Sequence, residues 1–231
     1  MAQIIDGPRL TPRGGKAKQL VVFLHGYGAD GNDLIDIAQQ WQSLLPDTAF
    51  ASPHAPDRCI QSPQGRQWFS LTISAAGLRD PAEYWQGVND ASPALNSFLD
   101  AELARYGLDD SRMALVGFSQ GTMMALHVGL RRTKAPAAIV GYSGMLVGPD
   151  HINEAKARNA QGKTPPVLLV HGDQDDVVPS QALFMASNAL GEANIPCQWH
   201  LSEGIGHGID GPGLMHGGLF LAHSFGVKLP V

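Results

Sequence analysis

Short apolar runs of four to six residues alternate with amphipathic stretches along most of this 231-residue chain. Consecutive apolar positions over such a length are typical of strands that are buried on both faces of a sheet. The runs cover residues 20–24, 48–51, 113–116, 137–142 and 166–170, and a further strand is expected over the mixed stretch 197–201. Helical periodicity and helix-end signals mark residues 33–45, 89–106, 123–130, 180–190 and 214–225. Strands and helices that alternate at this interval predict an α/β fold, with a mainly parallel central sheet and helices on both faces.

Two segments depart from this alternation. Residues 1–18 contain scattered glycines and prolines, which predicts an extended arm or a short hairpin ahead of the core. Residues 57–85 mix prolines and glycines with aromatic and aliphatic side chains, and are too long for an ordinary connection. We expect an irregular insertion near the functional site, with a structural crossover that contacts no ligand as the alternative. The total length suits a single domain over residues 1–231.

Composition narrows the classes of function. Hydrophobic residues make up 44% of the chain and charged residues 16%, as in ordinary soluble globular proteins. A net charge of −5 supplies no basic face for nucleic acid and no attraction to anionic membranes. Residues 1–19 lack the apolar core of a secretory signal, and no run reaches the length of a membrane span. We therefore expect a cytoplasmic protein without nucleic-acid partners or stable membrane insertion.

The two cysteines, Cys59 and Cys197, lack the local spacing of a zinc site. Two reduced thiols are favoured, although the sequence leaves a single disulfide between them open. No heptad pattern or apolar surface stripe is visible. The sequence thus leaves the oligomeric state undecided, with a homodimer as one option.

The most informative motif is Gly117-Phe118-Ser119-Gln120-Gly121, between an apolar strand and a buried helix. A G-x-S-x-G sequence on a strand-to-helix turn is the nucleophile elbow of an α/β-hydrolase. Glycine is needed at both flanks because strand and helix nearly touch there, and the serine takes a strained conformation. The helix directs its N-terminal N–H groups to the place where negative charge develops. The alternative is a tight turn in which the serine only caps the helix.

A serine nucleophile needs a general base, and the base needs an acid that orients it. In this fold the three follow the order Ser, Asp or Glu, His, each after a strand. Asp175 lies at the turn of the loop after residues 166–170 and is the preferred acid. Asp176 is the next candidate, while Asp173 is expected to support the loop through turn hydrogen bonds.

His207 is the predicted base. It follows the predicted strand 197–201. Gly206 and Gly208 stand on either side of it, and they let the backbone approach the sheet and turn the imidazole toward Ser119. The chain contains nine histidines, and a lone histidine is usually structural. His200 lies within a predicted strand, and His216 and His223 lie on the last predicted helix, so none of these three is expected to be catalytic.

Two backbone N–H groups are required to bind the oxyanion. One belongs to Gln120, directly after the nucleophile, and we assign the other to Tyr27 in the segment His25-Gly26-Tyr27-Gly28, which fits the HG-type motif of esterases. A glycine turn without substrate contact is the alternative. A phosphate loop is disfavoured because G-x-x-x-x-G-K-[ST] is absent.

Together, the segments 24–31, 117–121, 171–179 and 206–208 resemble those of the phospholipase/carboxylesterase family of small α/β-hydrolases, which includes bacterial carboxylesterases and acyl-protein thioesterases. The resemblance extends from about Gly7 to the last predicted helix. It implies a triad of Ser119, Asp175 and His207 and chemistry without a metal or organic cofactor. The segment 66–70 resembles the family's R-x-W-[FY]-D sequence near the substrate groove, with Ser70 in place of the usual acid.

The expected reaction is the hydrolysis of short-to-medium acyl esters through an acyl-enzyme. We assign the acyl pocket to apolar residues of the insertion and of the loop after the predicted acid: Trp68, Leu71, Ile73, Leu78, Val177 and Val178. Thioester or lysophospholipid hydrolysis uses the same machinery and stays open. Peptide hydrolysis is less favoured, as is dienelactone hydrolysis, whose usual nucleophile is cysteine. A ligand receptor without turnover requires impaired machinery, whereas every required residue is present.

Overall fold

The computed structural model describes residues 3–71, 81–158 and 163–228. A seven-stranded sheet of order β1-β3-β2-β6-β7-β8-β9 forms its centre. Its strands are β1 (Arg9–Leu10), β2 (Gln19–Leu24), β3 (Thr48–Ala51), β6 (Met113–Phe118), β7 (Ala138–Tyr142), β8 (Val167–Gly172) and β9 (Cys197–Ser202). Neighbours are parallel, except that β1 runs antiparallel to β3. The predicted mainly parallel sheet is confirmed, and the expected N-terminal arm contributes an edge strand to it.

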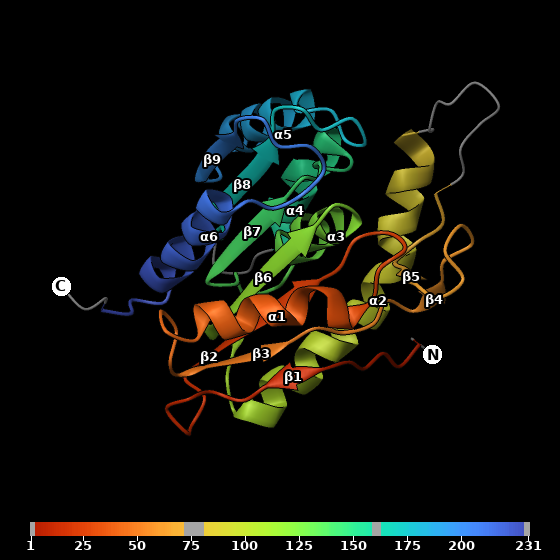
Figure 1. Cartoon of the computed structure of the whole chain (residues 1–231). Helices are drawn as coiled ribbons and strands as arrows, with labels where there is room; N and C mark the ends of the chain where they lie inside the picture. Colours follow the sequence, from red (N-terminus) through yellow and green to blue (C-terminus); the bar gives the residue numbers. More distant parts are fainter. Residues whose placement is uncertain (1–2, 72–80, 159–162, 229–231) are drawn as a thin grey trace.

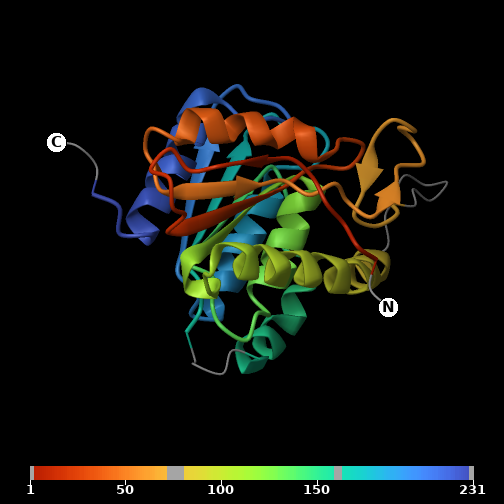
Figure 2. The same cartoon turned by 90° about the horizontal axis from the view of Figure 1, so that it is seen from below.

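Helices cover both faces of the sheet (Figures 1 and 2). One face carries α1 (Gly31–Trp41) and α6 (Gly211–Ser224), and the other carries α2 (Pro81–Tyr106), α3 (Gln120–Gly129), α4 (Ile152–Arg158) and α5 (Gln181–Glu192). Two single-turn 3₁₀ helices cover Asp110–Arg112 and Pro149–His151. The strands therefore lie between two helical layers, as the apolar runs predict.

Strand β2 shows how the sheet divides the core. Leu20, Val22 and Leu24 pack in the cluster that includes α2, α3 and α5, whereas Val21 and Phe23 pack in the cluster that includes α1 and α6. Successive side chains of a strand point to opposite faces, so a strand between two helical layers buries every position. The continuous apolar run at residues 20–24 follows from this arrangement.

Helix α2 differs most from the predicted elements. It begins at Pro81, whereas the sequence predicts a start at residue 89. Proline breaks a helix interior but fits the first turn, where the missing N–H would have no partner in the helix. Pro93 lies inside this helix as well. Pro81 therefore marks the beginning of a helix within what the sequence suggested was irregular chain.

Two helices begin at aspartate caps that the sequence pattern did not indicate. Asp30 caps α1 by accepting the N–H of Asn32 at 2.8 Å, so this helix begins before residue 33. Asp210 caps α6 by accepting the N–H of Gly213 at 2.9 Å, so this helix begins before residue 214. In both cases a carboxylate satisfies an N–H of the first turn that has no partner within the helix.

The stretch 57–85 is partly regular. Strands β4 (Asp57–Arg58) and β5 (Arg66–Gln67) form a two-stranded antiparallel sheet, which lies next to the N-terminal half of α2 (Figures 1 and 2). Trp68 and Phe69 directly follow β5 and are buried in the core cluster that includes α2. This segment therefore contributes to the core, in addition to forming surface.

Within the described part of the chain, no helix has the length and apolar character that crossing a bilayer requires. Cys59 is buried and Cys197 is half-buried, and both are free thiols. The disulfide that the sequence left open is therefore not formed.

Candidate active site

Ser119 occupies the turn between β6 and α3. Its φ of 53° and ψ of −116° are a strained combination for a residue with a side chain. It precedes the helix, yet its side chain forms no capping hydrogen bond. A Cβ added at Gly117 would collide with the backbone of Gly121, and one added at Gly121 would collide with the backbone of Leu24. The close approach of strand and helix therefore requires both glycines and places the serine, which is 8% exposed, at a sharp turn.

Asp175 and His207 lie together, although 32 residues separate them in the chain. The Nδ1 atom of His207 is 2.7 Å from Oδ2 of Asp175. Because an ionised carboxylate only accepts, Nδ1 carries the proton and Nε2 is left as the acceptor of the ring. The ring of Phe118, the residue before Ser119, has its centroid 5.0 Å from that of His207. The loop after β9 thus lies beside the turn that carries the serine.

The environment of Asp175 keeps this carboxyl group ionised. Burial by itself raises its pKa, but hydrogen bonds from the backbone N–H of Val178, from His207 and from the N–H of Val177 outweigh burial. The pKa of Asp175 therefore lies below the usual 3.8. The two backbone donors bind Oδ1 at 2.8 Å and 3.0 Å, which leaves Oδ2 for the imidazole.

The two other aspartates of this loop have different surroundings. Asp176 is exposed. Asp173 is exposed as well, and its Oδ1 accepts the N–H of Gly204 at 2.7 Å, which ties the loop after β8 to the loop after β9. Of these three carboxylates, the one at residue 175 binds the imidazole of His207.

The loop of residues 25–29 passes next to Ser119. A Cβ added at Gly26 would lie 3.4 Å from the Cβ of Ser119 and 3.1 Å from the ring of Phe118. Gly28 has a φ of +82° and donates its N–H to the carbonyl of Arg66 at 2.9 Å. Tyr27 lies between these two glycines, and Gln120 is the first residue of α3. Both proposed oxyanion donors therefore belong to segments that border the serine.

A model of the phospholipase/carboxylesterase family matches residues 6–224. The chain belongs to this family. It is 30% identical over 199 residues to acyl-protein thioesterase 1 of Schizosaccharomyces pombe, across 84% of this chain and 86% of that one. The corresponding thioesterase of Gibberella zeae is 26% identical over 208 residues, across 87% and 88%. The crystal structure of esterase PE8 superimposes with a TM-score of 0.88 at 42% identity, across 95% of this chain and 99% of that one.

Family membership confirms the resemblance drawn from the sequence motifs and identifies the chain as a serine hydrolase.

Several residues that support the site in this family member were not predicted from sequence. His25 is completely buried, and its Nε2 accepts the N–H of Ala55 at 3.0 Å. Its Nδ1 therefore carries the proton and donates to the carbonyl of Gly26 at 2.8 Å. Burial lowers the pKa of His25 to about 4, so the ring is neutral near pH 7 and braces the loop without charge.

Trp68, which the sequence assigned to the acyl pocket, contacts the loop of residues 25–29 from the core. It is 1% exposed, and its Nε1 donates to the carbonyl of His25 at 3.0 Å. The side chain of Gln120, at the start of α3, binds the backbone of residues 68–69. Its Oε1 accepts the N–H of Trp68 at 2.9 Å, and its Nε2 donates to the carbonyl of Phe69 at 2.8 Å. Residues 68–69 thus connect the loop after β2 to the start of α3.

We expect Gln120→Leu to lower the free energy of unfolding by about 2–4 kcal/mol. The amide is completely buried, and its loss leaves the N–H of Trp68 and the carbonyl of Phe69 without their partner, at about 1–3 kcal/mol for each buried group. Urea titration followed by far-UV circular dichroism measures the change.

Gln86→Leu is the matched control, because the amide of Gln86 binds Asp90 on the exposed face of α2. Its expected effect is within about 0.5 kcal/mol. A loss below about 1 kcal/mol for Gln120→Leu would show that this amide does not connect the two segments.

The remaining residues predicted for the acyl pocket are dispersed. Leu71 is half-buried against the core, Val177 is 55% exposed and Val178 is buried. Ile73 and Leu78 lie outside the described residues. Of the described members of this set, Trp68 lines the larger cavity described below, and none lines the smaller one.

An apolar cavity of about 370 Å³ opens close to the serine at a different place. Its lining comprises Pro81, Tyr84, residues 145–150, Ala182, Met185 and Ala186. Met145 directly follows Gly144, where an added Cβ would lie 2.8 Å from the carbonyl oxygen of Ser119. The hydroxyl of Ser143 donates to the carbonyl of Gly208 at 3.2 Å, so this segment also reaches the histidine loop. The apolar residues at positions 145–147 were the available sequence signal for this cavity.

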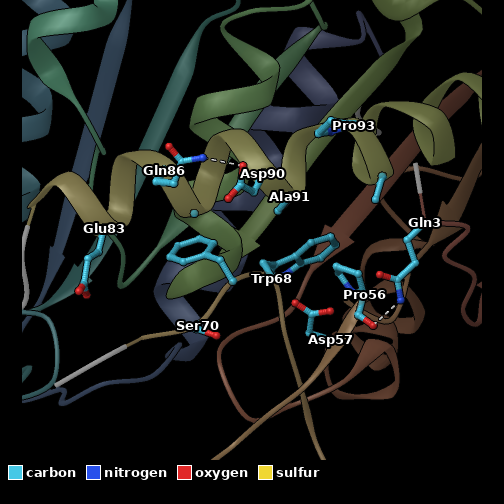
Figure 3. A pocket seen from close by; sticks show the side chains of 13 residues that line it. Gln3, Pro56, Asp57, Trp68, Ser70, Glu83, Gln86, Asp90, Ala91 and Pro93 are labelled. Atoms are coloured by element: carbon cyan, nitrogen blue, oxygen red, sulfur yellow. Dashed lines mark hydrogen bonds between the residues drawn. The ribbon is translucent and has the colours of Figure 1, made fainter. Parts of the chain in front are cut away.

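A second cavity, of about 740 Å³, lies between α2, the β4–β5 segment and the N-terminal residues (Figure 3). Asp57, Glu83 and Asp90 line it together with Trp68 and Ser70. Ser119, Asp175 and His207 do not belong to its lining. The smaller cavity does not include these three residues in its lining either, but its Met145 adjoins Gly144, which approaches the carbonyl oxygen of Ser119.

Proposed function

We propose that this serine hydrolase is a carboxylesterase that cleaves short-to-medium acyl esters through an acyl-enzyme on Ser119. The observation that carries the proposal is the pair of Asp175 and His207, joined at 2.7 Å beside the strained turn of Ser119. A base whose tautomer is fixed by a buried carboxylate is the arrangement that activates a serine hydroxyl.

In the first half of the reaction, Nε2 of His207 removes the proton of Ser119 as Oγ attacks the acyl carbonyl. The negative charge that forms on the carbonyl oxygen is stabilised by the N–H groups of Tyr27 and Gln120. His207 then returns the proton to the leaving alcohol, and the acyl group stays on the serine. Asp175 stays ionised, holds the imidazole and stabilises its cation.

In the second half, His207 takes a proton from water, and the resulting nucleophile attacks the acyl-enzyme. The same two N–H groups stabilise the second oxyanion. Collapse of this intermediate breaks the bond to Oγ, the serine regains its proton from His207, and the carboxylic acid leaves.

We assign the acyl chain to the cavity beside Met145. Its volume of about 370 Å³ lies at the small end of the usual range for ligand pockets, about 300–1,000 Å³. Its walls are mostly aliphatic, from Leu146 and Val147 on one side and Ala182 and Met185 of α5 on the other. A small apolar cavity lined by the segment that adjoins the serine turn favours short-to-medium aliphatic acyl groups.

We expect Ala182→Phe to lower kcat/KM for an octanoyl ester by at least about 10-fold relative to an acetyl ester. Removing room for a few methylenes of the substrate costs roughly 1–3 kcal/mol for each. Hydrolysis of a p-nitrophenyl ester series from acetyl to dodecanoyl measures the change in preference.

Ala189→Phe is the matched control, because Ala189 lies about two turns further along α5 and outside the lining of this cavity. It should leave the acetyl-to-octanoyl ratio unchanged. An equal loss for both esters in Ala182→Phe, or the same change of ratio in Ala189→Phe, would contradict the assignment of the acyl chain to this cavity.

Covalent labelling tests the proposed chemistry directly. A fluorophosphonate probe should add once to the protein, and peptide mass spectrometry should locate the adduct on Ser119. Protein that binds acyl esters but forms neither adduct nor product would be a receptor on this fold, and the esterase proposal would fail.

Thioester hydrolysis is the second candidate, supported by the acyl-protein thioesterases among the relatives. The same residues act on both classes, because only the leaving group differs. Parallel assays with matched octanoyl esters, octanoyl thioesters and lysophospholipids decide between them through the ratio of kcat/KM values.

A further inference from the structure

The two edges of the central sheet differ in length and charge. At one edge, β1 is two residues long, and its Arg9 forms hydrogen bonds of 2.8 Å and 2.9 Å with Glu102. At the other edge, β9 is six residues long and contains no acidic side chain, lysine or arginine. Natural edge strands are usually protected by shortness, charge, proline or a bulge. Strand β9 lacks a charge and an internal proline, and it lies between α5 and α6 at the margin of the sheet (Figure 1).

Exposed apolar side chains occur on all three elements at this margin of the sheet. Among the described residues, the large exposed hydrophobic ones on α5, β9 and α6 are Phe184, Met185, Trp199, Met215 and Leu219. The rings of Phe184 and Trp199 pack edge to face, with centroids 5.4 Å apart. Because these residues come from three separate elements, the sequence shows no single stripe.

The hydrogen bonds of β9 to β8 fix which backbone groups face outward. The N–H of Val167 donates to the carbonyl of Pro196, and the N–H of Asp173 donates to the carbonyl of Ser202. In a parallel ladder alternate residues of one strand bond the neighbour, so the even-numbered residues of β9 face β8. Cys197, Trp199 and Leu201 therefore direct their N–H and carbonyl groups away from the sheet.

The charge of this edge favours a second copy of the same chain. Residues 164–227 contain no lysine or arginine, β9 and α6 contain no charged residue, and α5 contains only Glu192 at its last position. A two-fold axis brings each residue close to its own copy, so any charge near the axis would repel itself. An uncharged strand avoids this repulsion, because the acidic residues that flank it in the sequence, Glu192 and Glu203, lie outside β9.

We propose that β9 pairs antiparallel with β9 of a second copy, around a two-fold axis at Trp199. Trp199 faces its own copy in this register, and Cys197 faces Leu201, so the outward N–H and carbonyl groups of all three are satisfied. Two seven-stranded sheets then form one continuous sheet. The apolar side chains of α5 and α6 add contact area on both sides of the strand pair, toward the roughly 1,200–2,000 Å² that a stable interface buries.

Sedimentation velocity of the full chain from about 1 to 100 μM tests the dimer. We expect a dimer in the wild type and a dissociation constant raised by at least about 100-fold in Trp199→Asp, which places two carboxylates at the axis. Ile60→Asp, at an exposed hydrophobic residue that is 76% exposed and lies outside α5, β9 and α6, is the control and should dissociate like the wild type. Unchanged ester turnover in Trp199→Asp shows that this variant is folded. A wild type that is monomeric at 100 μM, or a dimer that Trp199→Asp does not weaken, would overturn the proposal.

Disulfide trapping tests the register in a Cys197→Ser background, in which the remaining Cys59 is buried. Trp199→Cys should form an intermolecular disulfide on mild oxidation, because directly opposite residues of an antiparallel pair have Cα atoms about 4.5–5.5 Å apart. Gln198→Cys should not, because its copy lies two positions away along the pair, at about 8 Å. A disulfide at residue 198 but not at residue 199 would overturn the proposed axis.

Discussion

Ser119→Ala is expected to lower kcat for p-nitrophenyl acetate by about 10⁶-fold while leaving the fold intact. In serine hydrolases with a triad, loss of the nucleophile costs about as much as loss of the whole triad, roughly 2 × 10⁶ in kcat. A residual acceleration of about 10³–10⁴ over water should persist, since the N–H groups of Tyr27 and Gln120 are untouched. Alanine at this position also keeps a Cβ at the strained φ of 53°, so stability should change little.

Ser70→Ala is the matched control for this substitution. The hydroxyl of Ser70 accepts the side-chain N–H of Gln67 at 3.0 Å in the segment after β5, and its loss should change kcat less than about 2-fold. Turnover is measured with protein purified from a host that lacks the major background esterases, and folding is checked by thermal unfolding. More than about 10% of wild-type turnover in Ser119→Ala would exclude this serine as the nucleophile.

The sequence predicted the sheet because a strand that is buried on both faces is apolar at nearly every position. In β2 and β6 every position is covered by a helical layer, so the apolar runs coincide with the strands. The three candidate catalytic residues could be selected for a related reason. Each follows a strand of a parallel sheet, and the carboxyl ends of such strands lie at one edge. Its position at the turn of the loop then favoured Asp175 as the candidate acid, and chain order with the flanking glycines favoured His207 as the candidate base.

The supporting residues and the cavity depend on contacts that have no local sequence pattern. The hydrogen bond from Trp68 to His25 joins positions 43 residues apart, and the bonds from Gln120 to residues 68 and 69 span about 50 positions. An aromatic residue in an irregular segment is equally compatible with a pocket wall and with the core. The exposed apolar side chains near β9 could not be predicted to lie together for the same reason, since Phe184 and Trp199 meet only after α5 packs on β9.

Asp175→Asn should lower kcat by about 10⁴-fold without unfolding the protein. The amide oxygen can still accept the N–H groups of Val177 and Val178, so the loop keeps its shape. The amide nitrogen then faces Nδ1 of His207 and donates to it, which moves the ring proton to Nε2. A ring protonated at Nε2 cannot accept the proton of Ser119. An equivalent substitution in another triad hydrolase reduces kcat to this extent.

Asp176→Asn is the matched control, because it removes the adjacent carboxylate from the same loop. Asp176 is exposed, whereas Asp175 holds the imidazole, so Asp176→Asn should change kcat less than about 2-fold. Steady-state kinetics on the same ester from pH 6 to pH 9 compares the two variants with the wild type. If Asp176→Asn were the variant that lost activity, the residue that orients His207 during turnover would be Asp176, and the contact at 2.7 Å would not be the catalytic one.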